Sequence, residues 1–162
     1  MEDKTGDNMD IQEFKEHIPD FLQQAFYIGD HLSKCKTKLD VSLESIEKMD
    51  PIVEYVHHLW KKHLIDDTVA WNFSVAFGVL LGEIIIRNHG FHWTMIDDIP
   101  VVETNEGNRL SPITKILKIV TDEDDSEGTP SSFYDGFKVL QQYSDMSEEE
   151  REKITVYINN DE

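Results

Sequence analysis

The chain has almost no cysteine and few basic residues, and each shortage excludes a class of protein. Cys35 is the one cysteine among 162 residues, so neither an intramolecular disulfide nor a cysteine-rich zinc site can form. Fifteen lysines and arginines stand against 33 aspartates and glutamates, which gives a net charge of −18 at pH 7. This balance argues against binding to nucleic-acid backbones and to anionic membrane surfaces, since both need a positively charged surface.

The motifs of common catalytic and metal sites are missing as well. The sequence contains no HExxH motif, no P-loop and no GxSxG nucleophile elbow. Lysines surround Cys35 and favour a reactive thiol, but no histidine and aspartate can be assigned to it as partners. We therefore expect a protein that is not an enzyme, without catalytic residues, metal or cofactor.

No long uninterrupted hydrophobic run is present. The longest apolar stretch, residues 69–86, contains Asn72, Ser74 and Glu83, whereas a membrane-spanning helix needs about 20 mainly apolar residues. The first ten residues are polar and acidic, unlike the basic and apolar regions of a secretory signal. We expect a cytoplasmic protein whose most apolar stretch is a buried core helix.

Hydrophobic periodicity predicts that helices dominate the first half of the chain. Apolar residues recur at steps of three and four over 10–30, where Asp10 can cap the helix, and again over 43–60. Pro19 is expected to split the first of these helices in two. Pro51 is expected to kink or break the second, because proline removes a backbone hydrogen-bond donor.

The most apolar element is expected to be a central helix over 67–88. Gly90 can end it as a left-handed cap. Gly78 and Gly82 share one face of this helix, and glycine inside a helix costs about 1 kcal/mol relative to alanine. Two such glycines indicate that another element packs closely against that face.

After Gly90 the apolar period changes towards two. Strands are predicted over 91–96 and 100–104, with a turn at 105–108 in which Gly107 can take positive φ. Ser42 is expected to cap the helix over 43–60. The remaining predicted elements are a short strand over 38–42, a third sheet strand at Arg109–Leu110, a helix led by Pro112 and a last helix over 131–143.

These elements predict a single α+β domain: a central buried helix with flanking helices and a small antiparallel sheet. The domain is expected over 10–145. A flexible leader at 1–9 is expected to precede it, and an acidic segment at 146–162 to follow it.

Glu83 stands alone in the apolar helix, and a buried carboxylate has to be partnered or neutral. Arg87, four residues on, is well placed for an ion pair on one helix face. One interpretation is a structural pair that ties the helix to a neighbouring backbone. The other is a catalytic or ligand pocket, for which Glu83, Arg87 and Trp93 would have to converge.

Five of the seven histidines fall into two groups along the chain, three within 57–63 and two on either side of Gly90. They do not have metal-ligand spacing, since adjacent helical residues point apart. We expect surface or interface histidines at these positions: His57, His58, His63, His89 and His92.

An acidic run occupies residues 122–127. It does not match an EF-hand loop, because positions six and twelve hold Glu127 and Phe133 instead of glycine and glutamate. A solvated loop is one interpretation, and a contact site for a basic partner is the other. The contact residues would be Asp122, Glu123, Asp124, Asp125 and Glu127, with Glu148–Glu150 as a second acidic run. We expect their replacement to leave stability nearly unchanged.

Two segments resemble a family of small bacterial proteins. The first is LDVSLESIEKMD at 39–50. The second is FGVLLGEIIIRNHG at 77–90 with Trp93, which together give the string GxxLGExxxRNxGxxW. A proline-led helix with Lys115 and Lys118 follows, so the resemblance covers about residues 38–120. It implies an α+β domain and brings no activity, cofactor or site.

Charge and the missing catalytic motifs lead to the functional hypothesis. A small acidic protein is suited to capture a basic protein, because complementary charge raises association rate and specificity. The sharpest form of this hypothesis is a bacterial immunity protein that neutralises a toxin. The alternative is an enzyme or small-ligand-binding domain that uses Glu83, Arg87 and Trp93.

Overall fold

The computed structural model describes residues 10–32 and 36–153, and it has the expected α+β fold. The elements in chain order are α1 (Ile11–His31), α2 (Glu44–Lys61), α3 (Asp67–His89), β1 (His92–Ile96), β2 (Ile99–Glu103), β3 (Arg109–Leu110), α4 (Pro112–Val120) and α5 (Pro130–Ser144). The chain divides into two compact units, residues 1–131 and 132–162, so the boundary falls inside α5. The fold and site described below belong to the first unit.

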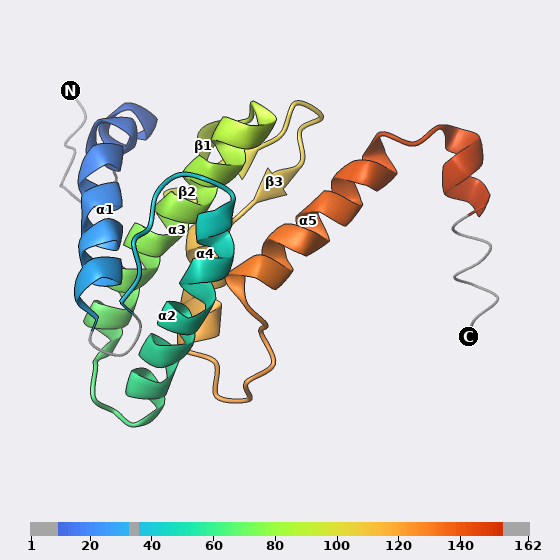
Figure 1. Cartoon of the computed structure of the whole chain (residues 1–162). Helices are drawn as coiled ribbons and strands as arrows, with labels where there is room; N and C mark the ends of the chain where they lie inside the picture. Colours follow the sequence, from blue (N-terminus) through green and yellow to red (C-terminus); the bar gives the residue numbers. More distant parts are fainter. Residues whose placement is uncertain (1–9, 33–35, 154–162) are drawn as a thin grey trace. The chain divides into compact units, whose positions relative to one another are not determined.

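The core of this unit is built around α3, as expected. Thirteen of its residues are buried, and it packs against α1, α4 and α2; Figure 1 shows it running alongside α1. By length and composition α3 could cross a membrane, with a mean hydropathy of 1.9. However, 72% of that apolar window is buried inside the fold, which is typical of the core helix of a globular domain.

Helix α3 is capped at its N-terminus by the Asp66 side chain and at its C-terminus by Gly90. The Asp66 carboxylate accepts a hydrogen bond from the Val69 amide at 2.9 Å and so satisfies one free donor of the first turn. Gly90 takes the left-handed conformation, φ 72°, and its amide donates to the Ile86 carbonyl. The predicted end of this helix is confirmed.

The prolines do not interrupt their helices, so the expected split at Pro19 is wrong, and of the kink or break expected at Pro51 the break is wrong. Helices α1 and α2 are continuous through them. Both prolines are exposed, so the carbonyl groups that lose a partner can reach water. Apolar burial continues on both sides of each proline, and it outweighs the cost of about 3 kcal/mol for proline in a helix.

The segment before α2 is irregular, so neither the predicted strand over 38–42 nor the Ser42 cap is present. Asp40 organises this segment instead. Its carboxylate accepts hydrogen bonds from the hydroxyl and amide of Ser42, at 2.5 and 2.9 Å, and from the Ser45 hydroxyl at 2.9 Å. These donors lower the pKa of Asp40 to about 2, the Ser42 hydroxyl contributing most.

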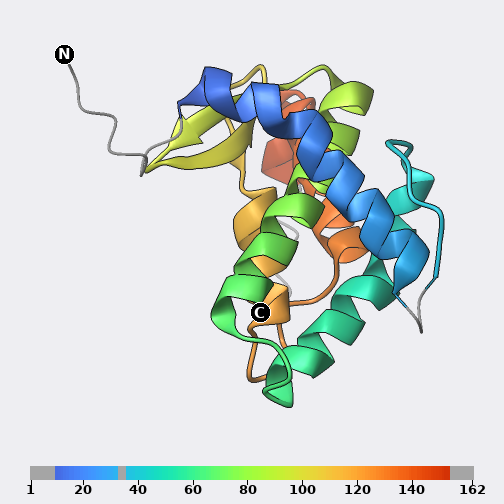
Figure 2. The ribbon, with the colours of Figure 1, turned by 90° about the vertical axis from the view of Figure 1, so that its left-hand side faces the viewer.

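The three strands form an antiparallel sheet in the order β1-β2-β3, which confirms the predicted meander. Trp93 lies opposite Val102 in the first pair of strands, and Leu110 lies opposite Val102 in the second. Asp97 and Asp98 both have positive φ and make the two-residue turn between β1 and β2. Figure 2 looks at the unit from the side of α1, and the first two strands lie next to the N-terminal end of that helix.

Three sequence expectations fall wholly or partly outside the described residues. The leader at 1–9 and Cys35 are among residues that the structure does not describe, and the segment 146–162 is described only to residue 153. Residues 148–153 are helical. The expected domain bounds at 10 and 145 stay a prediction.

Candidate functional site

Glu83, Arg87 and Trp93 converge, as one of the two interpretations required. The Trp93 indole N–H donates to Oε2 of Glu83 at 2.9 Å, and the Arg87 guanidinium donates to Oε1 at 3.3 Å. Glu83 is 9% exposed, whereas the Arg87 side chain is 51% exposed. Both oxygens of the buried carboxylate are therefore engaged by other side chains.

The two glycines of α3 explain how Trp93 reaches Glu83. A Cβ on Gly82 would lie 2.2 Å from Cη2 of the Trp93 ring, and a Cβ on Gly78 would lie 2.4 Å from the Cα of Ile113. Only glycine allows the β1 indole and the start of α4 to approach α3 this closely. The predicted close packing is confirmed, and Trp93 also packs edge-on against Phe14 with ring centroids 4.9 Å apart.

This arrangement favours the structural interpretation of Glu83. Its carboxylate ties β1 to α3 through a side chain, not through the backbone contact that the sequence interpretation expected. The cavities described on α1 and beside α2 are lined by other residues. A pocket for Glu83, Arg87 and Trp93 therefore gains no support from their geometry.

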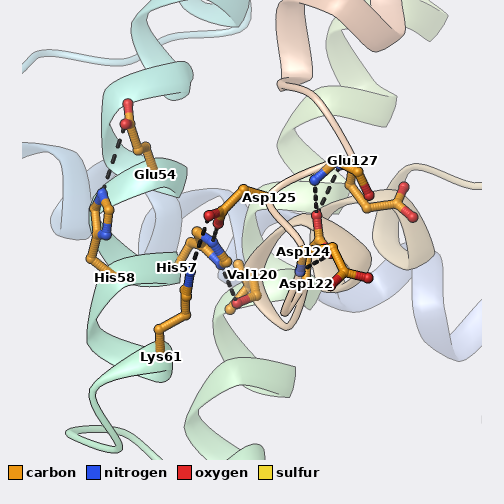
Figure 3. A network of polar contacts seen from close by, with 10 residues as sticks. Glu54, His57, His58, Lys61, Val120, Asp122, Asp124, Asp125 and Glu127 are labelled. Atoms are coloured by element: carbon orange, nitrogen blue, oxygen red, sulfur yellow. Dashed lines mark hydrogen bonds and ion pairs between the residues drawn. The ribbon is translucent and has the colours of Figure 1, made fainter.

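The acidic loop is folded around Asp122. Its carboxylate accepts hydrogen bonds from three backbone amides: Asp124 at 3.0 Å, Ser126 at 2.5 Å and Glu127 at 2.9 Å. These donors, that of Asp124 first, lower the pKa of Asp122 from its ordinary value. The loop thus has a defined backbone conformation, and Figure 3 shows Asp122 beside Asp124 and Glu127.

Asp125 fastens this loop to α2. Its Oδ1 lies 2.5 Å from Nε2 of His57, and its Oδ2 accepts from the Lys61 ammonium at 3.0 Å. The hydrogen bond from His57 and then that from Lys61 lower the pKa of Asp125. Asp125 holds φ at 56°, in the left-handed region that aspartate tolerates better than most residues.

His57 is buried, at 7% exposure, so the expectation of a surface or interface histidine is wrong here. Its Nδ1 lies 2.9 Å from the Val120 carbonyl at the end of α4. The sequence does hold a signal for this burial, because His57 stands four residues after the buried Val53 on the apolar side of α2. Its partners, 63 and 68 residues away, could not be found from spacing.

The remaining acidic residues of the loop differ in the hydrogen bonds and ion pairs that their side chains make. Lys115 binds Glu127 twice, at the carbonyl (2.6 Å) and at the carboxylate (3.0 Å). The side chains of Glu123 and Asp124 are exposed, and they make no hydrogen bond or ion pair with any residue that the structure describes. Glu148–Glu150 lie in the second unit, within the helical residues 148–153.

The expectation that replacing these charges leaves stability nearly unchanged stays a prediction, and the contacts divide the loop residues into two groups. Asp122 and Asp125 hold the loop together and attach it to α2, whereas Glu123 and Asp124 fit the expectation. Asp50 closes the far end of the loop, since its carboxylate accepts from the amide of Ser131 at 3.0 Å and also from its hydroxyl.

A cavity of about 460 Å³ lies between α2 and the acidic loop. Its lining residues are Asp50, Val53, Glu54, His57, His58, Ile119, Asp122, Asp125, Glu127, Gly128, Thr129 and Pro130. Five of them carry carboxylates, so the cavity has the electrostatic character to attract positive charge. Within residues 10–32 and 36–153, no group of three histidine, cysteine or acidic side chains is arranged to hold a metal ion.

Comparison with known proteins adds a fold relationship. No protein-family model and no curated protein matches the chain. A crystal structure from Bacteroides thetaiotaomicron VPI-5482 is similar, with a TM-score of 0.54 at 15% sequence identity. The match covers 85% of this chain and 51% of that one, so this chain spans about half the length of its structural neighbour. At this identity the likeness concerns the fold alone.

Proposed function

We propose that this protein is a non-catalytic, cytoplasmic binding protein that captures a basic protein partner through its acidic loop. The observation that carries the proposal is that the acidic side chains of the loop fall into two groups, one bound within the fold and one exposed. Asp122 and Asp125 fix the loop conformation, and Glu123 and Asp124 project from it with exposed, unpaired carboxylates. Because hydrogen bonds already hold the backbone of this loop, less conformational entropy is lost when a lysine or arginine of the partner pairs with the two charges.

The charge of the whole chain supports the same proposal. A net charge of −18 creates a negative potential that attracts a basic partner and raises its association rate. The carboxylates that line the cavity beside α2 add to this potential on the side where the loop lies. A partner with several lysines or arginines fits such a spread of acidic groups better than a single metal ion does.

The sharper form of the proposal is that the chain is a bacterial immunity protein and that the basic partner is a toxin. A growth-protection experiment tests this form. The product of the gene beside this one is expressed in a sensitive host, with and without this protein. We expect growth arrest by the neighbour's product alone and recovery when both are made. A neighbour that is harmless, or toxicity that this protein does not relieve, would contradict the immunity role.

The alternative, an enzyme or ligand-binding domain that uses Glu83, Arg87 and Trp93, has less support. A general acid or base needs an oxygen that can reach a substrate, and a ligand site needs an unfilled volume. Both oxygens of Glu83 already accept hydrogen bonds from Arg87 and Trp93, and the Trp93 ring fills the space over Gly82.

A further inference from the structure

His57 has an unusual pair of neighbours, because each ring nitrogen faces an acceptor. Nδ1 lies 2.9 Å from the Val120 carbonyl oxygen, and Nε2 lies 2.5 Å from Oδ1 of Asp125. A carbonyl oxygen can only accept, so Nδ1 carries a proton and donates it. The His57 side chain is 8% exposed and the Asp125 side chain is 60% exposed, so the ring is shielded from water and the carboxylate is not.

The second contact requires a donor as well. The Asp125 carboxyl is 60% exposed, and the Lys61 ammonium at 3.0 Å from its Oδ2 favours the ionised form. An ionised carboxylate can only accept, so the contact at Oδ1 needs a proton on Nε2. Only the protonated, positively charged imidazole has N–H groups at both nitrogens.

The titratable and charged groups around His57 come from α2, α4 and the loop. From α2, the His58 ring centroid lies 5.9 Å away, and His58 itself pairs with Glu54 at 3.8 Å. On α4, Lys115 is bound to Glu127, and Lys118 is exposed. The other charged groups that line the same cavity are Asp50, Glu54, Asp122 and Glu127. The surroundings are therefore mainly acidic.

We propose that His57 is a proton-controlled latch: when protonated it fastens Asp125 of the acidic loop to α2, and when neutral it releases Asp125, while Lys115 and Asp50 keep their bonds to Glu127 and Ser131. A neutral ring keeps its N–H towards Val120 and turns the lone pair of Nε2 towards the carboxylate of Asp125. That contact is repulsive, and Asp125 has no other bond to α2 than the exposed ion pair with Lys61 within the described chain. Figure 3 shows His57 between Val120 and Asp125, with Lys61 beside them.

The latch has two limits in pH. As pH rises, His57 loses the proton that Nε2 donates, and Asp125 is released from α2. As pH falls to strongly acidic values, Asp125 is protonated and ceases to be an anionic acceptor. Because the pKa of Asp125 is lowered in the folded protein, its contribution is complete above the ordinary aspartate value and is lost only below it. This device does not depend on the proposed function, since it concerns the isolated chain.

Nuclear magnetic resonance of isotope-labelled full chain tests the latch directly. Long-range ¹H–¹⁵N spectra distinguish an imidazole with two protonated nitrogens from one with a single proton, between about pH 5 and about pH 9. We expect His57 to have both nitrogens protonated at the acidic end and to lose the Nε2 proton as pH rises. The amide signals of residues 122–127 should move with the same midpoint.

Matched variants separate the latch from a general effect of pH. In Asp125→Asn, the amide can accept from a protonated ring and donate to a neutral one, so the loop signals should stay constant across the range. Asp124→Asn removes the same charge from an unpaired neighbour, and His58→Gln removes the adjacent histidine; both should keep the wild-type titration. His57→Gln should give released loop signals at every pH. The proposal would be overturned if the His57 ring carried a single proton over the whole pH range. It would also be overturned if the loop signals did not change with the protonation of His57.

Discussion

The Trp93 ring occupies the space that a side chain at Gly82 would need: a Cβ at Gly82 would lie 2.2 Å from Cη2 of the indole. The same indole donates its N–H to Glu83, the residue that follows Gly82. Gly82 and Glu83 are neighbours on α3, and both contact the Trp93 side chain from β1. The glycine leaves room for the ring, and the buried carboxylate accepts its N–H hydrogen bond. This contact fixes the sheet against the central helix, and it uses three residues of the string GxxLGExxxRNxGxxW.

Alanine at either glycine of α3 should destabilise the fold. Gly82→Ala forces a methyl group into the Trp93 ring, and Gly78→Ala forces one into the backbone of Ile113, so each should cost about 1–3 kcal/mol or more. Gly136→Ala is the control, because nothing in the described residues lies within 4 Å of its Cβ position. It should leave the melting temperature unchanged or raise it, since alanine favours helix. Equal melting temperatures for all three variants would contradict the close packing.

The two donors to Glu83 should differ in their contribution to stability. Trp93→Phe removes the buried donor and leaves a carboxylate oxygen without its partner, which costs about 1–3 kcal/mol before any loss of packing. Arg87→Met removes an ion pair whose arginine is half exposed, and such pairs contribute about 0–1 kcal/mol. Urea unfolding of both variants measures the difference. A larger loss for Arg87→Met would show that the exposed pair, and not the indole, secures Glu83.

Asp40 should make stability fall in acid. Its pKa is about 2 in the folded chain and near 3.8 otherwise, so its contribution is complete above pH 4 and is lost as pH falls towards 2. Asp40→Asn should therefore be less stable than wild type at neutral pH, and this difference should shrink as the pH approaches 2. Unfolding curves over this range check it, with Asp124→Asn as a control that lacks folded partners. A difference that is constant with pH would contradict the assignment.

The acidic loop provides two variants that remove the same charge. Asp122→Asn with Asp125→Asn removes two charges that bind loop amides, His57 and Lys61, so we expect a lower melting temperature. Glu123→Gln with Asp124→Asn removes two unpaired charges, and its melting temperature should match that of wild type. Thermal unfolding at one ionic strength compares them. If both double variants melt together, the loop is not held by its aspartates.

The parts of the fold that depend on local sequence could be predicted. The apolar run of α3, its left-handed end at Gly90 and the alternation of the strands are encoded within short windows. The paired glycines Gly78 and Gly82 also indicated close packing correctly, because their cost in a helix has to be offset by a neighbour. The partners at those glycines, Ile113 and Trp93, could not be assigned from the helix pattern alone.

The wrong or missing predictions share a physical reason, which is tertiary context. Pro19 and Pro51 stay within helices because burial of the flanking apolar residues outweighs the local penalty. His57 is buried because Val120 and Asp125 arrive from more than 60 residues away. The division of the acidic loop into bound and free carboxylates has the same origin, since composition alone describes all of them as solvated charge.

Binding kinetics test the central claim, capture of a basic partner by the free loop charges, most directly. Wild-type protein is used to capture its partner from extracts of the source cell, and the identified partner is purified. Association rates are then measured at low and high salt for wild type and the two double variants. We expect a partner rich in lysine and arginine. Glu123→Gln with Asp124→Asn should associate several-fold more slowly at low salt and converge with wild type near 1 M salt, where the screening length is about 3 Å. An association rate equal to that of wild type at low salt, or a partner without basic excess, would contradict the account.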